Sequence, residues 1–522
     1  MIGIHLQPDL EATPATLTGS SARIVPQKES NRFSPFAFWL TPIAVCLALY
    51  FVGLRVWFMQ DDFYWLSLHN YVKDAHSLAF ALFAPMAQGT IRPLGERGFF
   101  LLFSHLFGVN ALPYRIFVFL NQFVNVALIA AIAQKLTRSA VAGMLAPILW
   151  LFNIALIAPM SWNSAYNEIQ CATFLLASFF FFLKYVETDR RSFYRWQWLT
   201  FVLGFGALEL NVVYPFVAAL YAVLFARKYL QSTAPLFAGS ALYLTIHLCV
   251  PAPEVTSYYR MDFHPASLAS TFLSYWKTLF GFAAFARLQQ LPNYWPDIAV
   301  AVFTAVVVYF SVRQRREERK LSIFFFGWFV IFLALLLPFA AHITEYYLTI
   351  PSIGMAMLGA YSVLLAWRSG ATSKAMAMLL VSAYVLPSAV FIYEGTRVYR
   401  DRSERVHSVV RGVTVAKELL NQKTIILEDV DDELFWTGLY FHPFSLFGWK
   451  DVYVGPESER RVQQDPHLPP IDDYFLSPAE TLRLLRSGRA AVLSINGRTL
   501  KDITRPYSLL NLPDPTSRSS VE

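Results

Sequence analysis

Apolar residues in this 522-residue chain arrive in uninterrupted runs of about 20, the length that a helix needs to cross the hydrocarbon core of a bilayer. The pair of runs over 196–226 is interpreted as two short helices that meet at Glu209-Leu210-Asn211. The fold class is therefore predicted to be a polytopic α-helical membrane protein with about eleven transmembrane helices. The predicted spans are 36–59, 114–135, 140–158, 168–186, 196–209, 211–226, 234–250, 296–312, 321–341, 347–367 and 375–394.

The polar segments between these runs divide the chain into three predicted parts. Residues 1–35 hold no apolar core of signal-peptide length and are expected to form a disordered cytoplasmic tail. Residues 36–395 are expected to form the transmembrane domain, with a long first outer loop over 60–113. Two apolar patches in this loop, 78–86 and 98–108, are too short to span and are expected to form helices along the membrane surface.

The third part, residues 396–522, is charged and rich in turns, and it contains no run long enough to span. TIILEDV (424–430) predicts a strand. Ser-Pro-Ala-Glu at 477–480 is a capping box that starts a helix, and Gly488 lies where this helix is expected to end. AAVLSI (490–495), Asn496-Gly497 and RTLKDI (498–503) predict a hairpin, because Asn-Gly suits a type I′ turn. These signals predict a small extracytoplasmic α/β domain.

Composition narrows the class of protein. Apolar residues make up 56% of the chain and charged residues 15%, and the mean hydropathy is +0.41. Soluble proteins carry about a quarter charged residues, so a soluble enzyme, a disordered chain and a nucleic-acid-binding module are excluded. Cys46, Cys171 and Cys249 all lie within or at the end of apolar runs, which argues against a disulfide framework.

The distribution of Lys and Arg predicts the orientation in the membrane. With the N-terminus inside, the short inner segments hold about three times as many Lys and Arg residues as the outer segments that precede residue 395. This bias places the N-terminus in the cytoplasm and the C-terminal domain outside. The high ratio of Arg to Lys favours a bacterial inner membrane.

Ionisable and polar residues gather at the outer ends of the predicted spans, where they are costly near hydrocarbon and usually face a cavity. For Asp61 and Asp62, which directly follow the first span, an ordinary solvated start of a loop is an equal alternative. For Glu168 the alternative is an acid at the start of a helix, where the helix dipole favours a negative charge. Arg55 is expected either to reach outward to the interface or to pair with an acid. The residues that outline the predicted cavity are Asp61, Asp62, Trp162, Asn163, Asn167, Glu168, Glu209, Asn211, His342, Glu345, Tyr346 and Tyr347.

The order of these elements resembles the GT-C superfamily of integral-membrane glycosyltransferases. The first span ends in an Asp-Asp pair, and a long outer loop then leads to Arg-Pro-Leu at 92–94. RSAVAGMLAPILWLFNIALIAPMSWNSAYNEIQCATFLLASFFFF (138–182), ALELNVVYP (207–215) and EYYLTIPSIGMAML (345–358) are similar to later elements of the family. Over roughly 36–395, the chain most resembles bacterial relatives of protein O-mannosyltransferases and the membrane half of tetratricopeptide-repeat O-mannosyltransferases.

The resemblance implies an inverting transfer of a sugar from a polyprenyl-phosphate-linked donor to an acceptor hydroxyl on the outer face. The acceptor is expected to be a lipid, a glycan or a protein. A carboxylate must take the proton of this hydroxyl, and Asp61 is the expected base, while Asp62 orients a helix end or contacts the acceptor. The candidates for binding the donor phosphate are Arg92, Arg260, Lys277 and Tyr347, and Arg55 is a further candidate.

No metal and no cofactor are predicted, because the outer loops show no His-rich or spaced Asp-x-Asp ligand set. The resemblance to a metal-independent branch implies the same. Leu208, Tyr346 and His247 stand at or near positions where the family usually has a cation. Two alternatives stay open: a flippase or transporter of lipid-linked sugars, and a catalytically silent scaffold that binds a partner through its outer domain.

Overall fold

The computed structural model describes residues 34–86, 89–250, 259–420 and 423–511. The predicted tail over 1–35 therefore lies almost wholly outside the described residues. The described chain begins with a helix and a group of short helices. These are α1 (Pro35–Tyr50), η1 (Phe51–Arg55), α2 (Asp62–Ser67), η2 (Leu68–Asn70), α3 (Ala75–Phe83), the π-helical η3 (Pro93–Gly98) and α4 (Phe99–Phe107).

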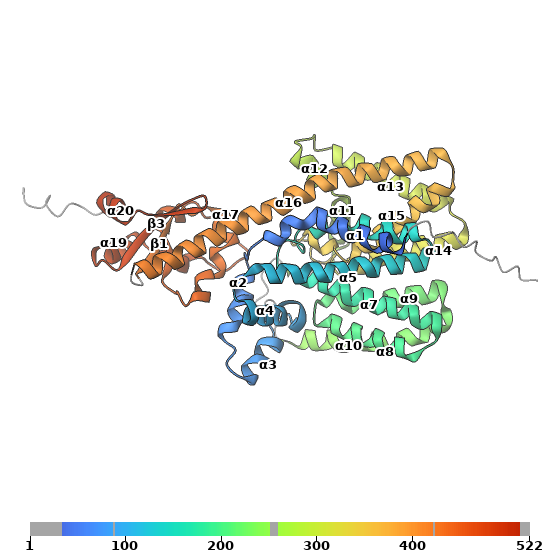
Figure 1. Ribbon diagram of the computed structural model, residues 1–522, viewed down its shortest axis with the longest axis horizontal. Helices are drawn as coiled ribbons and strands as arrows, with labels where there is room; N and C mark the ends of the chain where they lie inside the picture. Colours follow the sequence, from blue (N-terminus) through green and yellow to red (C-terminus); the bar gives the residue numbers. More distant parts are fainter. Residues whose placement is uncertain (1–33, 87–88, 251–258, 421–422, 512–522) are drawn as a thin grey trace, which may run out of the picture.

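A bundle of longer helices follows. Its elements are α5 (Ala111–Thr137), α6 (Ala140–Leu151), η4 (Ile154–Leu156), α7 (Tyr166–Thr188), α8 (Arg191–Phe205), η5 (Glu209–Val213), α9 (Tyr214–Phe225), η6 (Arg227–Thr233), α10 (Ala234–Cys249), α11 (Pro265–Leu279), α12 (Phe282–Leu288), α13 (Trp295–Arg313), α14 (Arg316–Ala334), η8 (Glu345–Leu348), α15 (Pro351–Arg368) and α16 (Ala371–Leu419). In this bundle α6 packs against both α5 and α15, while α7 packs against α5 and α8. Figure 1 shows these helices running side by side.

Helices occupy every predicted span, and 196–226 does form two helices joined by η5. By length and composition, four segments of the described chain are able to cross a membrane: Phe36–Arg55, Ala111–Thr137, Tyr166–Thr188 and Ala371–Leu419. Shorter apolar helices lie at 140–151, 209–225 and 295–309. The count of eleven spans stays a prediction. The patches at 78–86 and 98–108 form the helices α3 and α4, and their position along the membrane surface stays a prediction.

The last span continues well past its predicted end at 394. α16 runs without interruption to Leu419, and Figure 1 shows it extending from the bundle to the C-terminal sheet. In its charged second half, Val406, Val409, Val410 and Val413 are buried, at the spacing of one helix face. The predicted boundary near residue 395 therefore falls within a single helix.

The C-terminal region contains a small four-stranded sheet, and its elements confirm the predicted strand, capped helix and hairpin. The strand order is β2-β1-β3-β4, in which β1 is parallel to both neighbours and β3 and β4 form the antiparallel hairpin. The elements are β1 (Thr424–Glu428), α17 (Asp432–Thr437), η9 (Leu439–Phe441), η10 (Pro443–Phe447), β2 (Val452–Val454), α18 (Pro456–Glu459), η11 (Asp472–Tyr474), α19 (Pro478–Arg486), β3 (Ala490–Asn496), β4 (Thr499–Asp502) and α20 (Thr504–Asn511).

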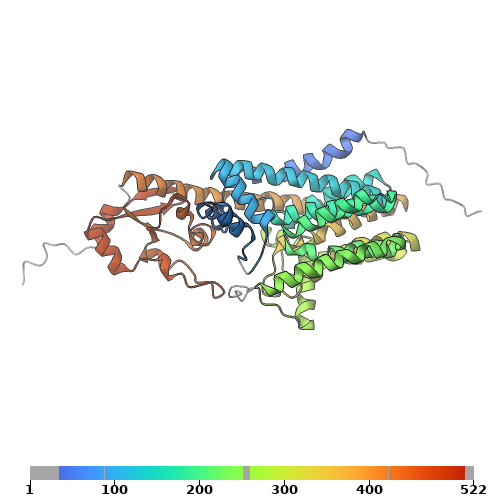
Figure 2. The same ribbon diagram turned by 90° about the horizontal axis from the view of Figure 1, so that it is seen from below.

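The sheet region is attached to α16 by charged contacts. Asp431 caps α17 by accepting from the backbone N–H of Leu434 at 2.9 Å, and its carboxylate pairs with Arg405 of α16 at 2.8 Å. The buried Lys417 pairs with Asp451. Figures 1 and 2 show α2, α3 and α4 at the end of the bundle that faces this sheet region.

Candidate functional site

The Asp61–Asp62 turn lies between η1 and α2 and is held in place from the C-terminal side. Gln60 has a positive φ of 52°, and its backbone N–H donates to the Thr437 carbonyl of α17 at 2.7 Å. The Trp57 ring stacks on His407 of α16 with a centroid distance of 4.4 Å, and the Trp57 backbone N–H donates to the Ser403 hydroxyl at 3.0 Å. The extension of α16 thus fixes the turn that carries both acids.

Asp62 is fully buried, and both of its carboxylate oxygens accept hydrogen bonds. One oxygen accepts from the backbone N–H and the hydroxyl of Ser164, at 2.8 and 2.6 Å. The other accepts from the Met59 N–H at 3.2 Å and the Asn163 amide at 3.5 Å. Burial raises the pKa of Asp62 to about 6, while these donors pull it down. Asp62 therefore joins the end of η1 to the loop over 161–165.

Arg115 supports the same loop from α5. It is fully buried and donates to the Gly53 carbonyl at 3.0 Å, to Asn163 at 3.1 Å and to the Met160 carbonyl. A Cβ on Gly53 would lie only 2.5 Å from the Met160 carbonyl oxygen, so the close approach requires glycine. Asn163, predicted as a cavity residue, is a buried link between Arg115 and Asp62.

Asp61 has a different environment, although it is the next residue along the chain. It is half-buried at the N-cap of α2, and among the described residues its buried Oδ1 has no hydrogen-bond partner. Burial, helped by the negative charges of Asp62 and Glu96, raises the pKa of Asp61 to about 8, although the Ser164 hydroxyl acts to lower it. Asp61 therefore keeps its proton up to a higher pH than an ordinary aspartate does.

Arg92 is the centre of a second cluster. Its Nε donates to both carboxylate oxygens of Glu209, at 3.0 and 2.9 Å, and its Nη1 pairs with Glu96. Glu96 is buried and also accepts from the Asn167 amide at 3.0 Å. Burial raises the pKa of Glu96, while the Arg92 charge lowers it. Two carboxylates therefore pair with Arg92, the cation that the sequence analysis predicts to bind the donor phosphate.

Backbone contacts bring Arg92 and Glu209 together, although 117 positions separate them. The N–H groups of Leu94 and Gly95 both donate to the Gly206 carbonyl, at 2.8 and 3.1 Å. A Cβ on Gly95 would lie 2.7 Å from the Ala207 carbonyl oxygen, so only glycine allows this approach. We call Arg92, Glu96, Asn167 and Glu209, together with these backbone contacts, the Arg92 clamp.

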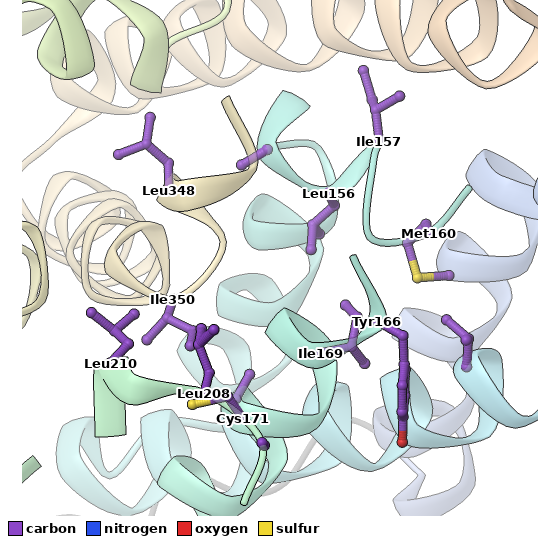
Figure 3. Close-up of a cluster of buried hydrophobic side chains, with 14 of the residues drawn as sticks. Leu156, Ile157, Met160, Tyr166, Ile169, Cys171, Leu208, Leu210, Leu348 and Ile350 are labelled. Carbon is purple, nitrogen blue, oxygen red and sulfur yellow. The ribbon is translucent and has the colours of Figure 1, made fainter. Parts of the chain in front are cut away.

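An apolar core lies beneath the loops of the site. Figure 3 shows Leu208 beside Cys171, and Leu210 beside Ile350, so the segments 208–210, 156–171 and 348–350 share one cluster. Leu208 is 8% exposed. At the position where the resemblance expects a Lys, this chain therefore has a core residue next to Glu209.

Glu168 and a group of aromatic rings lie close to the clamp. Glu168 is buried in the first turn of α7, within electrostatic reach of Arg92 and Glu209. The rings are in mutual contact: Trp162 with Tyr346, Tyr346 with Tyr347, Tyr347 with His342, and His342 with Tyr259. Asp61 and Arg92 both act on the pKa of Tyr259, which burial raises. Tyr347 is therefore near the site, within an aromatic wall. The sequence analysis predicted its other members as cavity residues, except for Tyr259.

The remaining candidates lie further from these clusters. Lys277 of α11 pairs with Asp297 of α13 at 2.7 Å. Arg260 is exposed beside Tyr259, and Arg55 and Glu345 are exposed as well. Arg92, rather than Arg55, pairs with Glu209. His247 is half-buried on α10, and its charge acts on Glu209.

Three important residues were missed by sequence reasoning. Glu96 is four positions after Arg92 in a helical turn, a spacing that favours an ion pair and gave a usable signal. Arg115 lies in an apolar run, where a charged residue usually marks an internal contact. Ser164 gave no signal, because its role depends on its distance from Asp62 in space.

The apolar helices and the buried acidic site together define an integral-membrane protein with a polar site at one end of its bundle. Residues 93–251, under a third of the chain, match the family model described as dolichyl-phosphate-mannose-protein mannosyltransferase. The resemblance to this GT-C glycosyltransferase family is confirmed for that segment, which includes Glu96, Asn163, Glu168 and Glu209. The Asp61–Asp62 turn precedes it.

Two solved structures are similar to this chain. The oligosaccharyltransferase of Archaeoglobus fulgidus, in a complex with Zn and sulfate, has 12% identity and a TM-score of 0.44, with 78% of this chain and 61% of that chain covered. This chain thus spans less than two thirds of that protein. ArnT from Cupriavidus metallidurans, bound to undecaprenyl phosphate, has 14% identity and a TM-score of 0.46, covering 88% of this chain and 93% of that one. No curated protein sequence matches.

Proposed function

We propose that this protein is a membrane glycosyltransferase that moves a sugar from a polyprenyl-phosphate-linked donor to an acceptor hydroxyl, with inversion at the anomeric carbon. The family match over 93–251 supports a glycosyltransferase that uses a lipid-linked donor. The sugar is a hexose or a pentose. The reaction takes place on the extracytoplasmic face of a membrane, proposed to be a bacterial inner membrane, with the N-terminus in the cytoplasm and the C-terminal region outside.

The observation that carries the proposal is the division of labour within the Asp61–Asp62 turn. Asp62 uses both carboxylate oxygens to hold the loop over 161–165. Asp61 keeps a buried oxygen that has no partner among the described residues, and its pKa of about 8 suits proton transfer near neutral pH. Asp61 is therefore the proposed general base, and Asp62 positions it.

In the proposed transfer, one bond to the anomeric carbon forms while another breaks. The acceptor hydroxyl gives its proton to the Asp61 carboxylate while its oxygen forms a bond to the anomeric carbon. The bond from that carbon to the phosphate oxygen breaks at the same time, and polyprenyl phosphate leaves with the electron pair. The leaving phosphate is already a stable anion, so the step needs cations or donors rather than a general acid.

The charge balance of the Arg92 clamp determines which residues are proposed to contact the donor phosphate. Arg92 already faces Glu96 and Glu209, which offset its charge. Arg260, exposed beside the aromatic wall, and the Tyr347 hydroxyl are the better placed candidates. Glu209 and Glu168 are the proposed acceptors for the sugar hydroxyls.

The charge balance at Arg92 favours one alternative, a non-catalytic protein that acts as a scaffold or flippase. A cation held by two carboxylates attracts a phosphate poorly. This alternative predicts that binding or transport persists without Asp61, whereas a transferase loses turnover.

The test is sugar release from synthetic polyprenyl-phosphate hexoses and pentoses by the purified protein in detergent. We expect Asp61→Asn to lower the rate by about 10²- to 10⁴-fold, because a general base contributes that much. Asp472→Asn removes an exposed carboxylate of η11 and is the matched control. Equal rates in the wild type and Asp61→Asn, or no turnover with any donor, would contradict the proposal.

A further inference from the structure

A cleft of about 760 Å³ separates the first outer loop from the C-terminal sheet region. One wall comes from α2, η2 and α3, and the other comes from β1, β2, η9, η10 and the residues around Trp449. Figure 2 shows the outer-loop helices next to the C-terminal region. The volume lies within the range of small-molecule sites. None of the residues discussed for the catalytic clusters lines this cleft.

Both walls present aromatic rings beside hydrogen-bonding groups. Tyr71 and Phe80 are 71% and 63% exposed on the outer-loop side, and Trp449 and Tyr453 face them from the C-terminal side. Hydroxyl, imidazole and ammonium groups lie among the rings. These groups belong to Ser67, Ser77, His442, Ser445 and Lys450, and the described lining residues include no carboxylate.

The walls are fixed before any ligand arrives. Buried Arg97 donates to the carbonyls of Leu82, Ala84 and Thr90, which secures the segment that follows α3. On the opposite wall, the Tyr474 hydroxyl donates to the Tyr440 carbonyl at 2.6 Å and lies 2.8 Å from His442 Nε2. Since the Tyr474 proton is used, Nε2 is the donor of that second bond, and the other nitrogen of the neutral ring is an acceptor.

The cleft lies one helical turn from the Asp61–Asp62 turn. Tyr64 lines the cleft and is three residues after Asp61, the N-cap of α2. Three residues correspond to about 4.5 Å along a helix. Asp61 itself does not line the cleft, so an occupant has to extend past Tyr64 to reach it.

We propose that this cleft binds a saccharide chain, the acceptor glycan whose terminal hydroxyl is presented to Asp61. Its role as an acceptor site rests on the proposed function, whereas saccharide binding does not. Sugar rings have apolar C–H faces that pack on aromatic rings and a rim of hydroxyls that pairs with mixed donors and acceptors. The lack of carboxylates on the lining argues against a basic peptide, and the ring-lined walls on two sides argue for a chain held between them.

The experiment measures binding of maltohexaose, mannohexaose and chitohexaose to full-length Asp61→Asn protein in detergent by isothermal titration calorimetry. Using this variant removes turnover from the measurement. We expect at least one hexasaccharide to bind. Phe80→Ala should raise its Kd about fivefold to tenfold, the effect of losing one aromatic contact. Phe83→Ala is the matched control, because Phe83 lies on the same helix with 59% exposure and does not line the cleft.

Each outcome decides between occupants. Binding that weakens only in Phe80→Ala supports the saccharide cleft, whether or not the wild type releases sugar from a donor. No binding of any hexasaccharide overturns it, even if donor turnover is intact. Equal effects of Phe80→Ala and Phe83→Ala also overturn it. In a Phe80→Trp variant in proteoliposomes, fluorescence quenching by brominated lipids that does not change on adding saccharide would assign this wall to the membrane interface instead.

Discussion

The Asp61–Asp62 turn and the Arg92 clamp are both built from buried and half-buried charged side chains, and they are close enough for Glu96 to raise the pKa of Asp61. Their charges are compensated in different ways. In the clamp, a guanidinium lies between two carboxylates. In the turn, neutral donors satisfy Asp62, Arg115 donates mainly to carbonyl oxygens, and one Asp61 oxygen has no partner within the described part of the chain. Similar residue types thus give an ion-paired joint in one place and a reactive carboxyl in the other.

The largest expected effect comes from removing the cation of the clamp. Arg92→Met leaves Glu96 and Glu209 facing each other in a buried site, so we expect the free energy of unfolding to fall by about 3–5 kcal/mol. The measurement is denaturant-induced unfolding in detergent. Arg397→Met, which removes an exposed pair with Glu394, is the control and is expected to cost at most about 1 kcal/mol. Equal losses in the two variants would show that the clamp is not a structural joint.

The next largest effect tests Asp61 as the general base through the pH dependence of sugar transfer. A base must be deprotonated, and burial raises the pKa of Asp61 to about 8. We therefore expect the rate of sugar transfer to fall about tenfold for each pH unit below 8. Rates at saturating donor from pH 6 to 10 give the profile. A flat profile between pH 6 and 8 would remove Asp61 from the role of base.

The helical elements of both regions could be predicted from the sequence, but the pairing of their side chains could not. Run lengths gave the helices, and the Asn-Gly turn gave the hairpin. The charged half of α16 was missed because its composition resembles a soluble domain, although Val406, Val409, Val410 and Val413 carry the helical period. The pair of Arg92 with Glu209 was not predicted, because no local pattern brings residue 92 to residue 209.

A smaller effect concerns the positioning residue. Asp62→Ala leaves the N–H groups of Met59 and Ser164 without their acceptor, and we expect a loss of about 1–3 kcal/mol in stability. Transfer should fall as well, because Asp61 loses its support. Ser164→Ala removes only the hydrogen bond from the Ser164 hydroxyl to Asp62, and it is expected to lower the free energy of unfolding by about half as much as Asp62→Ala does. If Asp62→Ala were as stable as the wild type, the loop over 161–165 would not depend on Asp62.

The smallest expected effect separates function from stability at Asp61. A folded-state pKa above the ordinary value of about 3.9 means that the folded protein prefers the neutral acid, so wild-type stability is lost as the pH rises from about 4 to 8. Asp61→Asn cannot ionise, and its melting temperature in detergent should exceed that of the wild type by about 2 °C or more at pH 8. The gain should shrink toward pH 5. Asp62→Asn should show no such gain, because it replaces an acceptor that four donors use. A gain of equal size at both pH values would attribute the effect to packing, and the contrast between the two acids would then lose its electrostatic basis.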